Sequence, residues 1–417
     1  MKFNKVFNFP FFCIIYMQIP LKKGKEAKGM KKLLVVMLAM VLVVSLFAGC
    51  KPASNKLDLS TRKFKIGLVT DVGGRGDRSF NDSALRGLET WAAKVKYVEG
   101  GGYEALTDEE YKASIPDDLK DKNIVPLDVE PIVLESKAKE DYIPNIQTLV
   151  EQKHVDLVIG VGFMLANAIG ESALKYPNTK FMLIDSTPVD ANGNPVNPPN
   201  AVGYLFKENE CGFLVGAIAG YATKANKVGY IGGMAIPPVL RYEAGFRAGV
   251  KTTNPNAQVI GQYTNSFTDA ALGKSAAQSQ MALGADVLFH AAGATGNGMF
   301  QAICEKGAPY WGIGVDVDMG LDPNLCPDRT LTSAIKHVDY ATYEAIKSVV
   351  DGTFQGGVVM LSLKDGGVGY APDHVKDVLT ADQIAKIENL RKMIIDGKFT
   401  VPEDPNAVNT WTPPTGF

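Results

Sequence analysis

The chain repeats one pattern of apolar and polar segments. Short apolar runs ending in Gly or Asp alternate with stretches whose apolar residues recur at helical spacing, as in buried parallel strands joined by helices. The runs at 65–71, 155–162 and 180–185 are echoed at 227–233, 285–293 and 310–316. The later pairs keep step, because Asp156 and Asp185 are 29 residues apart and Asp286 and Asp316 are 30 apart. The pattern predicts two similar α/β lobes.

The same periodicity predicts where the elements lie. We expect strands in the first lobe at 64–70, 131–135, 156–160 and 181–185, and helices from Ser79, at 143–152 and at 165–175. We expect strands in the second lobe at 228–231, 259–263, 287–290 and 311–315, and helices at 209–223, 242–252, 270–283 and 297–306. A crossing at 202–206, a return strand at 330–335, a helix at 340–351, a strand at 358–363 and a helix near 381–395 complete the plan.

These elements set the predicted organisation of the chain. The first lobe comprises 63–203 with about 336–360, and the second comprises 204–335 with about 361–417. The stretch 99–125 is polar and charged, so we predict an inserted loop outside the core with a short helix at 108–113.

The N-terminal region has the composition of a targeting segment. Met30-Lys31-Lys32 is followed by an apolar run at 33–47 and by Ala48-Gly49-Cys50, so we predict a signal peptide at 30–49. A Cys after Ala-Gly resembles the bacterial lipobox, which predicts a lipidated Cys50 and a flexible tether to residue 62. An ordinary signal peptide or a membrane anchor is the alternative, although the run is shorter than the roughly 20 residues of a spanning helix. Residues 1–29 are predicted to be a mis-called extension.

Charge and cysteine content exclude several classes of protein. The 417 residues are enough for two cores, and 43 Lys and Arg against 45 Asp and Glu favour neither nucleic acid nor another polyanion as a partner. Beyond the N-terminal region the cysteines are Cys211, Cys304 and Cys326, with no C-x-x-C motif. Because this set is odd and scattered and the chain has only 4 His, we predict inert thiols, no disulfide framework and no zinc site.

The sequence does not match the common nucleotide-binding and catalytic motifs. The loop at 72–77 does not match G-x-G-x-x-G, and Gly273-Lys274-Ser275 has Thr268 where a P-loop requires Gly. No hydrolase elbow, H-E-x-x-H motif or acid–base couple is present in the sequence. We therefore predict a protein that is not an enzyme and that uses no cofactor or metal.

The strand-end carboxylates are the first candidate site residues. Asp71, Asp185 and Asp316 each follow or end a predicted strand, at the edge where two α/β lobes form a cleft. Clefts between lobes commonly bind small molecules. In a binding protein such carboxylates accept hydrogen bonds from hydroxyl or ring N–H groups.

Aromatic residues supply the second part of the candidate site. Phe80 follows the first strand of lobe one, Phe267 follows the second strand of lobe two, and Tyr242 lies near a helix start. Rings from opposite lobes can enclose a flat ligand ring, although each residue also fits simple core packing. Lys336, after the return strand, is placed to reach a ribose hydroxyl or Asp316, or to remain solvated.

A series of short motifs runs along the chain in a fixed order. They are Gly67 to Gly74, Asp77-x-Ser79-Phe80-Asn81, Ile159 to Phe163, Ile184-Asp185, Gly232-Gly233, Gly245-Phe246-x-Ala248-Gly249, Ala291-Ala292-Gly293-x-Thr295-Gly296 and Gly314-Val315-Asp316-x-Asp318. Together these motifs resemble the basic membrane protein family of lipoproteins, which are substrate-binding subunits of ABC transporters that include purine nucleoside receptors. The resemblance covers about 65–363. The stretch 99–125 is longer than usual for this family, and Tyr242 stands where Phe is common.

The resemblance implies an α/β type I periplasmic binding protein fold, with two doubly wound, Rossmann-like lobes joined by a hinge. It implies Phe80 as the base-stacking ring with Phe267 opposite. Asp71, Asn81 and Asp185 would contact base or ribose, and Asp316 and Lys336 the ribose. Gly162, Phe163, Tyr242 and Gly293 complete the predicted site.

The resemblance also implies a function and partners. A purine nucleoside would be the ligand, an ABC permease the protein partner, and a lipid anchor the link to the extracytoplasmic face of the cell membrane, with the protein a monomer. Two alternatives stay open: a binder of a sugar or other small solute, and an extracytoplasmic nucleoside hydrolase that uses the strand-end aspartates.

Overall fold

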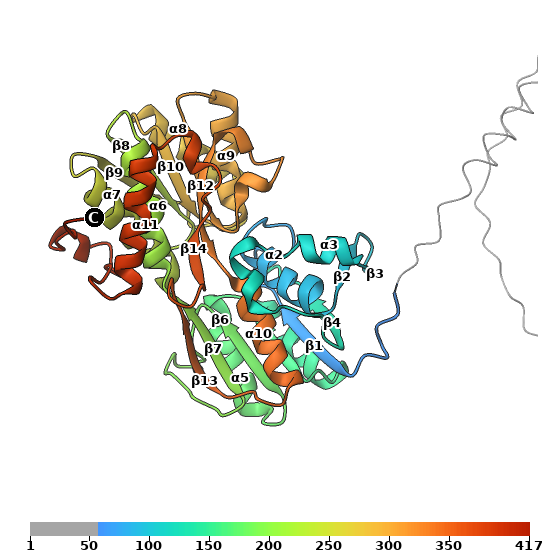
Figure 1. Cartoon of the computed structure of the whole chain (residues 1–417). Helices are drawn as coiled ribbons and strands as arrows, with labels where there is room; N and C mark the ends of the chain where they lie inside the picture. Colours follow the sequence, from blue (N-terminus) through green and yellow to red (C-terminus); the bar gives the residue numbers. More distant parts are fainter. Residues whose placement is uncertain (1–56) are drawn as a thin grey trace, which may run out of the picture. The chain divides into compact units, whose positions relative to one another are not determined.

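Two six-stranded sheets organise the computed structural model, which describes residues 57–417 (Figure 1). The first sheet has the order β13-β7-β6-β5-β1-β4 and is parallel throughout. Its strands are β1 (Phe64–Val69), β4 (Val129–Leu134), β5 (Leu157–Gly160), β6 (Lys180–Ile184), β7 (Ala201–Phe206) and β13 (Gly357–Leu361). We call this sheet with its helices lobe 1.

The second sheet repeats this plan in lobe 2. Its order is β14-β12-β11-β10-β8-β9, and only the β12–β14 pair is antiparallel. Its strands are β8 (Lys227–Gly232), β9 (Gln258–Tyr263), β10 (Val287–Ala291), β11 (Trp311–Asp316), β12 (Thr330–Lys336) and β14 (Val368–Tyr370). Every predicted strand is present, and the predicted two-lobed α/β fold is confirmed. The short β14 was not predicted.

Helices connect the strands of each lobe. In lobe 1 these are α2 (Phe80–Leu85) with the π-helix η1 (Arg86–Ala92), α4 (Tyr142–Gln147) with the π-helix η4 (Thr148–Gln152), α5 (Ala166–Lys175) and α10 (Val338–Val350). In lobe 2 these are α6 (Glu208–Ala222), α7 (Pro237–Thr253), α8 (Ala270–Ala282), α9 (Ala294–Lys306) and α11 (Ala381–Ile395). Short 3₁₀ turns are η2 (Asp117–Lys122), η3 (Lys139–Asp141), η5 (Phe163–Leu165), η6 (Met319–Leu321), η7 (Pro327–Arg329), η8 (Val375–Asp377) and η9 (Ala407–Asn409).

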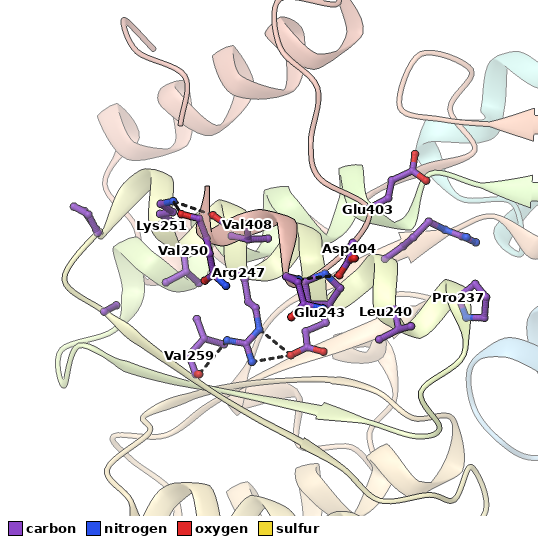
Figure 2. Close-up of a pocket in the computed structure, with 16 residues that line it drawn as sticks. Pro237, Leu240, Glu243, Arg247, Val250, Lys251, Val259, Glu403, Asp404 and Val408 are labelled. Carbon is purple, nitrogen blue, oxygen red and sulfur yellow. Dashed lines mark hydrogen bonds and ion pairs between the residues drawn. The ribbon is translucent and has the colours of Figure 1, made fainter. Parts of the chain in front are cut away.

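Burial explains the uniform hydrophobicity of the central strands and of α6. All residues of β5 and β10 are buried, as expected for parallel strands covered on both faces. Helix α6 packs closely against α7, and a Cβ added at Gly249 would come within 2.0 Å of the Phe213 carbonyl oxygen. Lys251 of α7 also donates to the carbonyl oxygen of Val408 at 2.9 Å, which ties the C-terminal segment to this helix (Figure 2).

Three chain connections join the lobes, and hydrogen bonds hold them together. The chain crosses from β7 to α6, from β12 to α10 and from β13 to β14. Lys207 N donates to Leu361 O at 2.9 Å, and His337 N donates to Gly367 O at 2.9 Å. The three crossings therefore form the hinge of the fold.

The stretch 99–125 has more structure than the sequence predicted. It contains part of the hairpin β2 (Val95–Val98) and β3 (Gly102–Ala105), then α3 (Asp108–Ala113), which confirms the predicted helix. The prediction that the stretch lies outside the core is wrong for Tyr111, Leu119 and Ile124, which are buried. Tyr343 Oη bridges the backbone N and O of Val125 at 2.9 Å each, so the stretch is fastened to α10.

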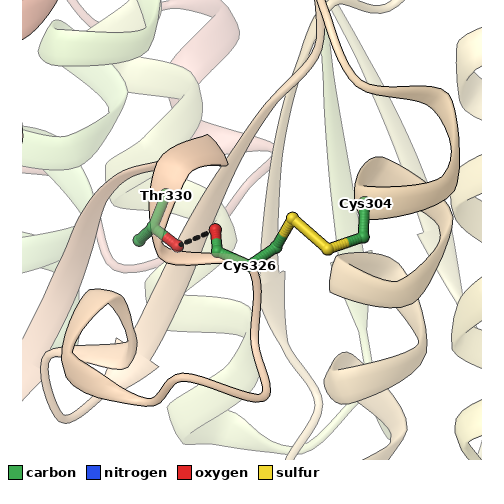
Figure 3. The surroundings of a disulfide bond; sticks show 3 residues. All are labelled: Cys304, Cys326 and Thr330. Atoms are coloured by element: carbon green, nitrogen blue, oxygen red, sulfur yellow. Dashed lines mark hydrogen bonds between the residues drawn. A yellow bond between two sulfur atoms is a disulfide. The ribbon is translucent and has the colours of Figure 1, made fainter.

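The cysteine prediction is wrong for two residues. Cys304 and Cys326 form a disulfide that joins the end of α9 to the loop before η7, with their Cα atoms 5.7 Å apart (Figure 3). Cys211 is a buried free thiol, as predicted. The odd count misled because one buried thiol belongs to the packing of α6 and the other two meet only in the folded chain.

The described residues contain no helix long and apolar enough to cross a membrane. The predicted signal peptide, the extension at 1–29 and Cys50 lie outside the described residues.

Candidate functional site

All eleven predicted site residues line one pocket of about 60 Å³. The pocket lies at the carboxyl ends of strands from both sheets, where parallel α/β sheets usually bind ligands. From lobe 1 come Asp71, Phe80, Asn81, Gly162, Phe163 and Asp185; from lobe 2 and the hinge come Tyr242, Phe267, Gly293, Asp316 and Lys336.

Matching positions in the two lobes share positive backbone φ angles. Gly162 and Gly293 follow β5 and β10 at φ 110° and 53°. Asp185 follows β6 and Asp316 ends β11, at φ 68° and 67°. The left-handed backbone conformation is uncommon for Asp and unfavourable in free energy, so it persists only where the surrounding contacts compensate for it. The strand-end aspartates are therefore held in equivalent, sparsely populated conformations on both sides of the pocket.

A hydrogen-bonded cluster forms the polar wall in lobe 1. Asn81 Nδ2 donates to Asp71 Oδ1 at 2.7 Å and to Asp77 Oδ2 at 2.9 Å. Asp71 N donates back to Asn81 Oδ1 at 3.2 Å, and Gly73 N donates to Asp71 Oδ1 at 2.7 Å. These bonds orient both the amide and the carboxylate. Burial raises the pKa of Asp71 above its usual range.

Asp77 is a site residue that the sequence analysis missed. It is buried and accepts backbone N–H bonds from Ser79 at 3.0 Å, Asn81 at 2.7 Å and Asp82 at 3.1 Å. Burial, with a contribution from Asp82, raises the pKa of Asp77 to about 7. The signal was an Asp just ahead of a predicted helix start, where carboxylates accept the free N–H groups. The other unpredicted lining residues are Gly73, Met164, Ile236, Pro238, Val239, Ala291, Ala292 and Val315.

Lys336 is the buried cation of the site. Its Nζ lies 3.0 and 2.8 Å from the oxygens of Asp185 and 3.4 Å from Glu208 Oε1. The Lys336 ammonium also lies 4.8 Å from the Phe80 ring centroid. The hydrogen bonds of Lys336 thus go to Asp185 and Glu208, whereas the sequence suggested Asp316 or a ribose hydroxyl.

Charge pairing decides the protonation state of Lys336. Burial by itself lowers the pKa of its ammonium, but the Asp185, Glu208 and Asp316 carboxylates outweigh burial and raise it. Glu208, which the sequence analysis missed, is fully buried and also accepts from Arg241 Nε at 2.6 Å. Asp185 is therefore held against a permanent positive charge.

Lobe 2 contributes a carboxylate and an aromatic wall. Tyr242 Oη donates to Asp316 Oδ1 at 3.2 Å, and burial raises the pKa of Asp316 to about 7. Phe267 packs over Gly233, where an added Cβ would lie 2.2 Å from the ring. Gly233 corresponds to Asp71 in the internal repeat. The two lobes therefore present different chemistry at the same repeat position.

A second, larger hollow of about 1000 Å³ lies between α7, β9 and residues 403–409 (Figure 2). None of the eleven predicted residues lines it. Arg247 is paired with Glu243 at 2.7 Å, and Lys251 with backbone carbonyl oxygens such as that of Val408. These two cations of the hollow are therefore already paired within the protein.

Three comparisons place the chain among known proteins. An "ABC transporter nucleoside-binding protein BmpA" of Lactococcus lactis subsp. cremoris is 32% identical over 393 residues, 89% of this chain and 99% of that protein. A lipoprotein of Pyrococcus abyssi is 35% identical over 340 residues, 79% of this chain and 74% of that protein. The crystal structure of a solute-binding protein of an ABC transporter system from Aeropyrum pernix K1 has a TM-score of 0.66 at 27% identity, covering 83% of this chain and 96% of that one.

The family match covers most of the described chain. Residues 64–405 match the family described as ABC transporter substrate-binding protein PnrA-like. The family is one of substrate-binding proteins, and the Aeropyrum structure is that of a solute-binding protein. The fold is that of a periplasmic binding protein, and the chain belongs to the PnrA-like family of ABC transporter substrate-binding proteins.

Proposed function

We propose that this protein binds a purine nucleoside in the pocket between its lobes and delivers it, chemically unaltered, to an ABC permease. One observation carries the proposal: Phe80 and Phe267, from opposite lobes, line the same pocket as the strand-end carboxylates Asp185 and Asp316. A nucleoside combines a flat aromatic base with several hydroxyl donors. Aromatic rings match the first part and carboxylates match the second.

Each wall has a proposed role. The Phe80 and Phe267 rings enclose the base. Asp71 and Asn81 accept hydrogen bonds from its polar edge, because both N–H groups of the Asn81 amide already donate to Asp71 and Asp77. Asp185 and Asp316 accept hydrogen bonds from ribose hydroxyls. Lys336 acts on the ribose largely by keeping Asp185 ionised, because its ammonium is already hydrogen-bonded to that carboxylate.

We expect ligand binding to favour the arrangement in which the two lobes are closed on each other. Arg78 Nη1 of lobe 1 lies 2.5 Å from Asp322 Oδ2 of lobe 2, and Lys336 joins β12 of lobe 2 to Asp185 of lobe 1. Only the closed arrangement allows one ligand to touch both walls. Ligand binding therefore shifts the population toward closure.

The proposed location is the extracytoplasmic face of the cell membrane, with the chain a lipid-anchored monomer attached through Cys50. The name of the Pyrococcus relative supports lipid attachment. The Cys304–Cys326 disulfide supports an oxidising compartment, where such bonds persist.

Calorimetric titration of the chain from Lys51, with inosine, adenosine, guanosine, uridine and ribose, tests the ligand class. Chromatography of the same mixtures then tests for reaction. Saturable binding of a purine nucleoside that is recovered intact is the expected result. Ribose competing as well as inosine would favour a sugar binder, and recovery of free base would favour a hydrolase. No heat with any nucleoside contradicts the proposal.

A further inference from the structure

The hairpin β2–β3 grips a loop of the pocket through one arginine. Arg75 donates to both oxygens of Glu89, from Nη1 at 2.9 Å and from Nη2 at 2.7 Å. Its guanidinium lies 4.0 Å from the Tyr97 ring centroid, and Tyr103 Oη donates to Glu89 Oε1 at 2.8 Å. We call these four residues the Arg75 clamp.

The chemistry of the clamp is specific to arginine. The planar guanidinium makes two parallel hydrogen bonds to a carboxylate while its face stacks on an aromatic ring, and lysine does neither. The Glu89 side chain is only 5% exposed, so the pair is shielded from solvent. Any other side chain at position 75 that cannot both bond to Glu89 and stack on Tyr97 is therefore expected to loosen the contact between the hairpin and the loop.

The clamped loop carries the residues that orient the polar wall. Arg75 lies between Asp71 and Asp77, and its backbone N donates to Glu135 Oε2 at 3.2 Å. Asp77 in turn accepts from the backbone N and from Nδ2 of Asn81, at 2.7 and 2.9 Å. Nδ2 of Asn81 also donates to Asp71. A continuous set of contacts thus runs from the hairpin to the Asp71–Asn81 pair.

We infer that the β2–β3 hairpin tunes ligand specificity: through Arg75 it fixes the 72–77 loop, so that Asp77 holds Asn81 and Asp71 in the orientation that reads the polar edge of the base. Arg75 does not line the pocket, so it is a positioning residue. The specificity part of the inference rests on the proposed nucleoside function. The part concerning the position of the 72–77 loop does not depend on which ligand is bound.

Four variants of the chain from Lys51 test the positioning part. Arg75→Lys keeps the charge beside Glu89 but loses the paired hydrogen bonds and the stacking. Tyr97→Leu removes the stacking and the edge contact of the Tyr97 ring with Tyr103, and leaves the Arg75–Glu89 pair. Tyr97→Phe keeps the ring. Lys120→Ala changes an exposed residue of η2 in the stretch 99–125, whose ion pair among the described residues is with Asp117. Deuterium exchange is measured at amides 71–82 without ligand. Faster exchange in the first two variants and unchanged exchange in the last two is expected; unchanged exchange in all four overturns the inference.

Inosine and purine riboside test the specificity part, because purine riboside lacks the 6-oxo and N1–H groups of the base edge. In Arg75→Lys we expect inosine affinity to fall about 10-fold and purine riboside affinity about 2-fold or less, as for loss of hydrogen bonds at one edge. Tyr97→Phe should retain wild-type affinity for both. Equal losses for both ligands would overturn the specificity role. If the wild type binds no nucleoside, the proposed function fails, and exchange at 71–82 still decides whether the hairpin holds the loop.

Discussion

Removing the Cys304–Cys326 disulfide is expected to destabilise the protein by a calculable amount. The bond closes a segment with a sequence separation of 22 residues that contains β11 and η6. Cross-linking such a segment lowers the conformational entropy of the unfolded chain. Loop-closure entropy for about 22 residues gives ~3.4 kcal/mol at 25 °C. A double variant, Cys304→Ser with Cys326→Ser, should therefore lose about that much free energy of unfolding.

Urea unfolding followed by circular dichroism measures this loss. With a slope of about 3 kcal/mol per M, the midpoint should fall by about 1 M. Reductant should lower the midpoint of the wild type but leave the double variant unchanged. Cys211→Ala serves as the control, because it removes a cysteine without removing the cross-link.

Two results would refute this reasoning. Cys211 is buried, so alkylation is carried out in urea without reductant. It should label only one of the three cysteines of the chain from Lys51, and three labelled thiols would show that the bond does not form. Equal midpoints for the oxidised wild type and the double variant would show that the bond forms without restricting the unfolded chain.

Four further perturbations address the pocket and the hinge. Phe80→Ala should weaken nucleoside binding by ~1–3 kcal/mol, the range for base–aromatic stacking. Phe80→Tyr keeps the ring and serves as the control. Unchanged affinity of the alanine variant in calorimetry would exclude stacking. Asp316→Ala should weaken binding of a nucleoside more than binding of its free base, and equal losses would exclude a ribose role. Lys336→Met leaves Asp185 and Glu208 buried without their cation and should cost ~3–5 kcal/mol in urea unfolding at pH 7. Because burial raises the pKa of Asp185, that deficit should shrink toward pH 5 as the carboxyl is protonated, and a pH-independent deficit would contradict this account. Burial lowers the pKa of His337, but its bonds to Asp118 and Asp339 outweigh burial and raise it to about 9. The stabilising contribution of protonated His337 is complete below pH 6.5 and is lost as pH rises through about 9. Between these values the free energy of unfolding should therefore fall more steeply with pH in the wild type than in His337→Gln. Parallel curves of unfolding free energy against pH would contradict this.

The sequence by itself determined the architecture and predicted eleven of the residues that line the pocket. Apolar runs with buried-strand periodicity are local signals, and a strand that ends in Gly or Asp places that residue at a known edge of a parallel sheet. Two copies of this pattern were enough to bring Asp185 and Asp316, or Gly162 and Gly293, to equivalent places. Each of these inferences requires only the order of residues along one segment.

Tertiary structure decided the pairings between distant segments. The partners of Lys336 lie 151 and 128 residues away in the sequence, because Lys336 ends β12 whereas Asp185 follows β6 and Glu208 begins α6. Cys304 meets Cys326 only because the loop after β11 returns to the end of α9. The stretch at 99–125 looked like an exposed insertion because its charges outnumber its apolar residues, yet Leu119 and Ile124 are buried. Such contacts depend on which surfaces meet when the lobes fold, and local periodicity carries no record of that.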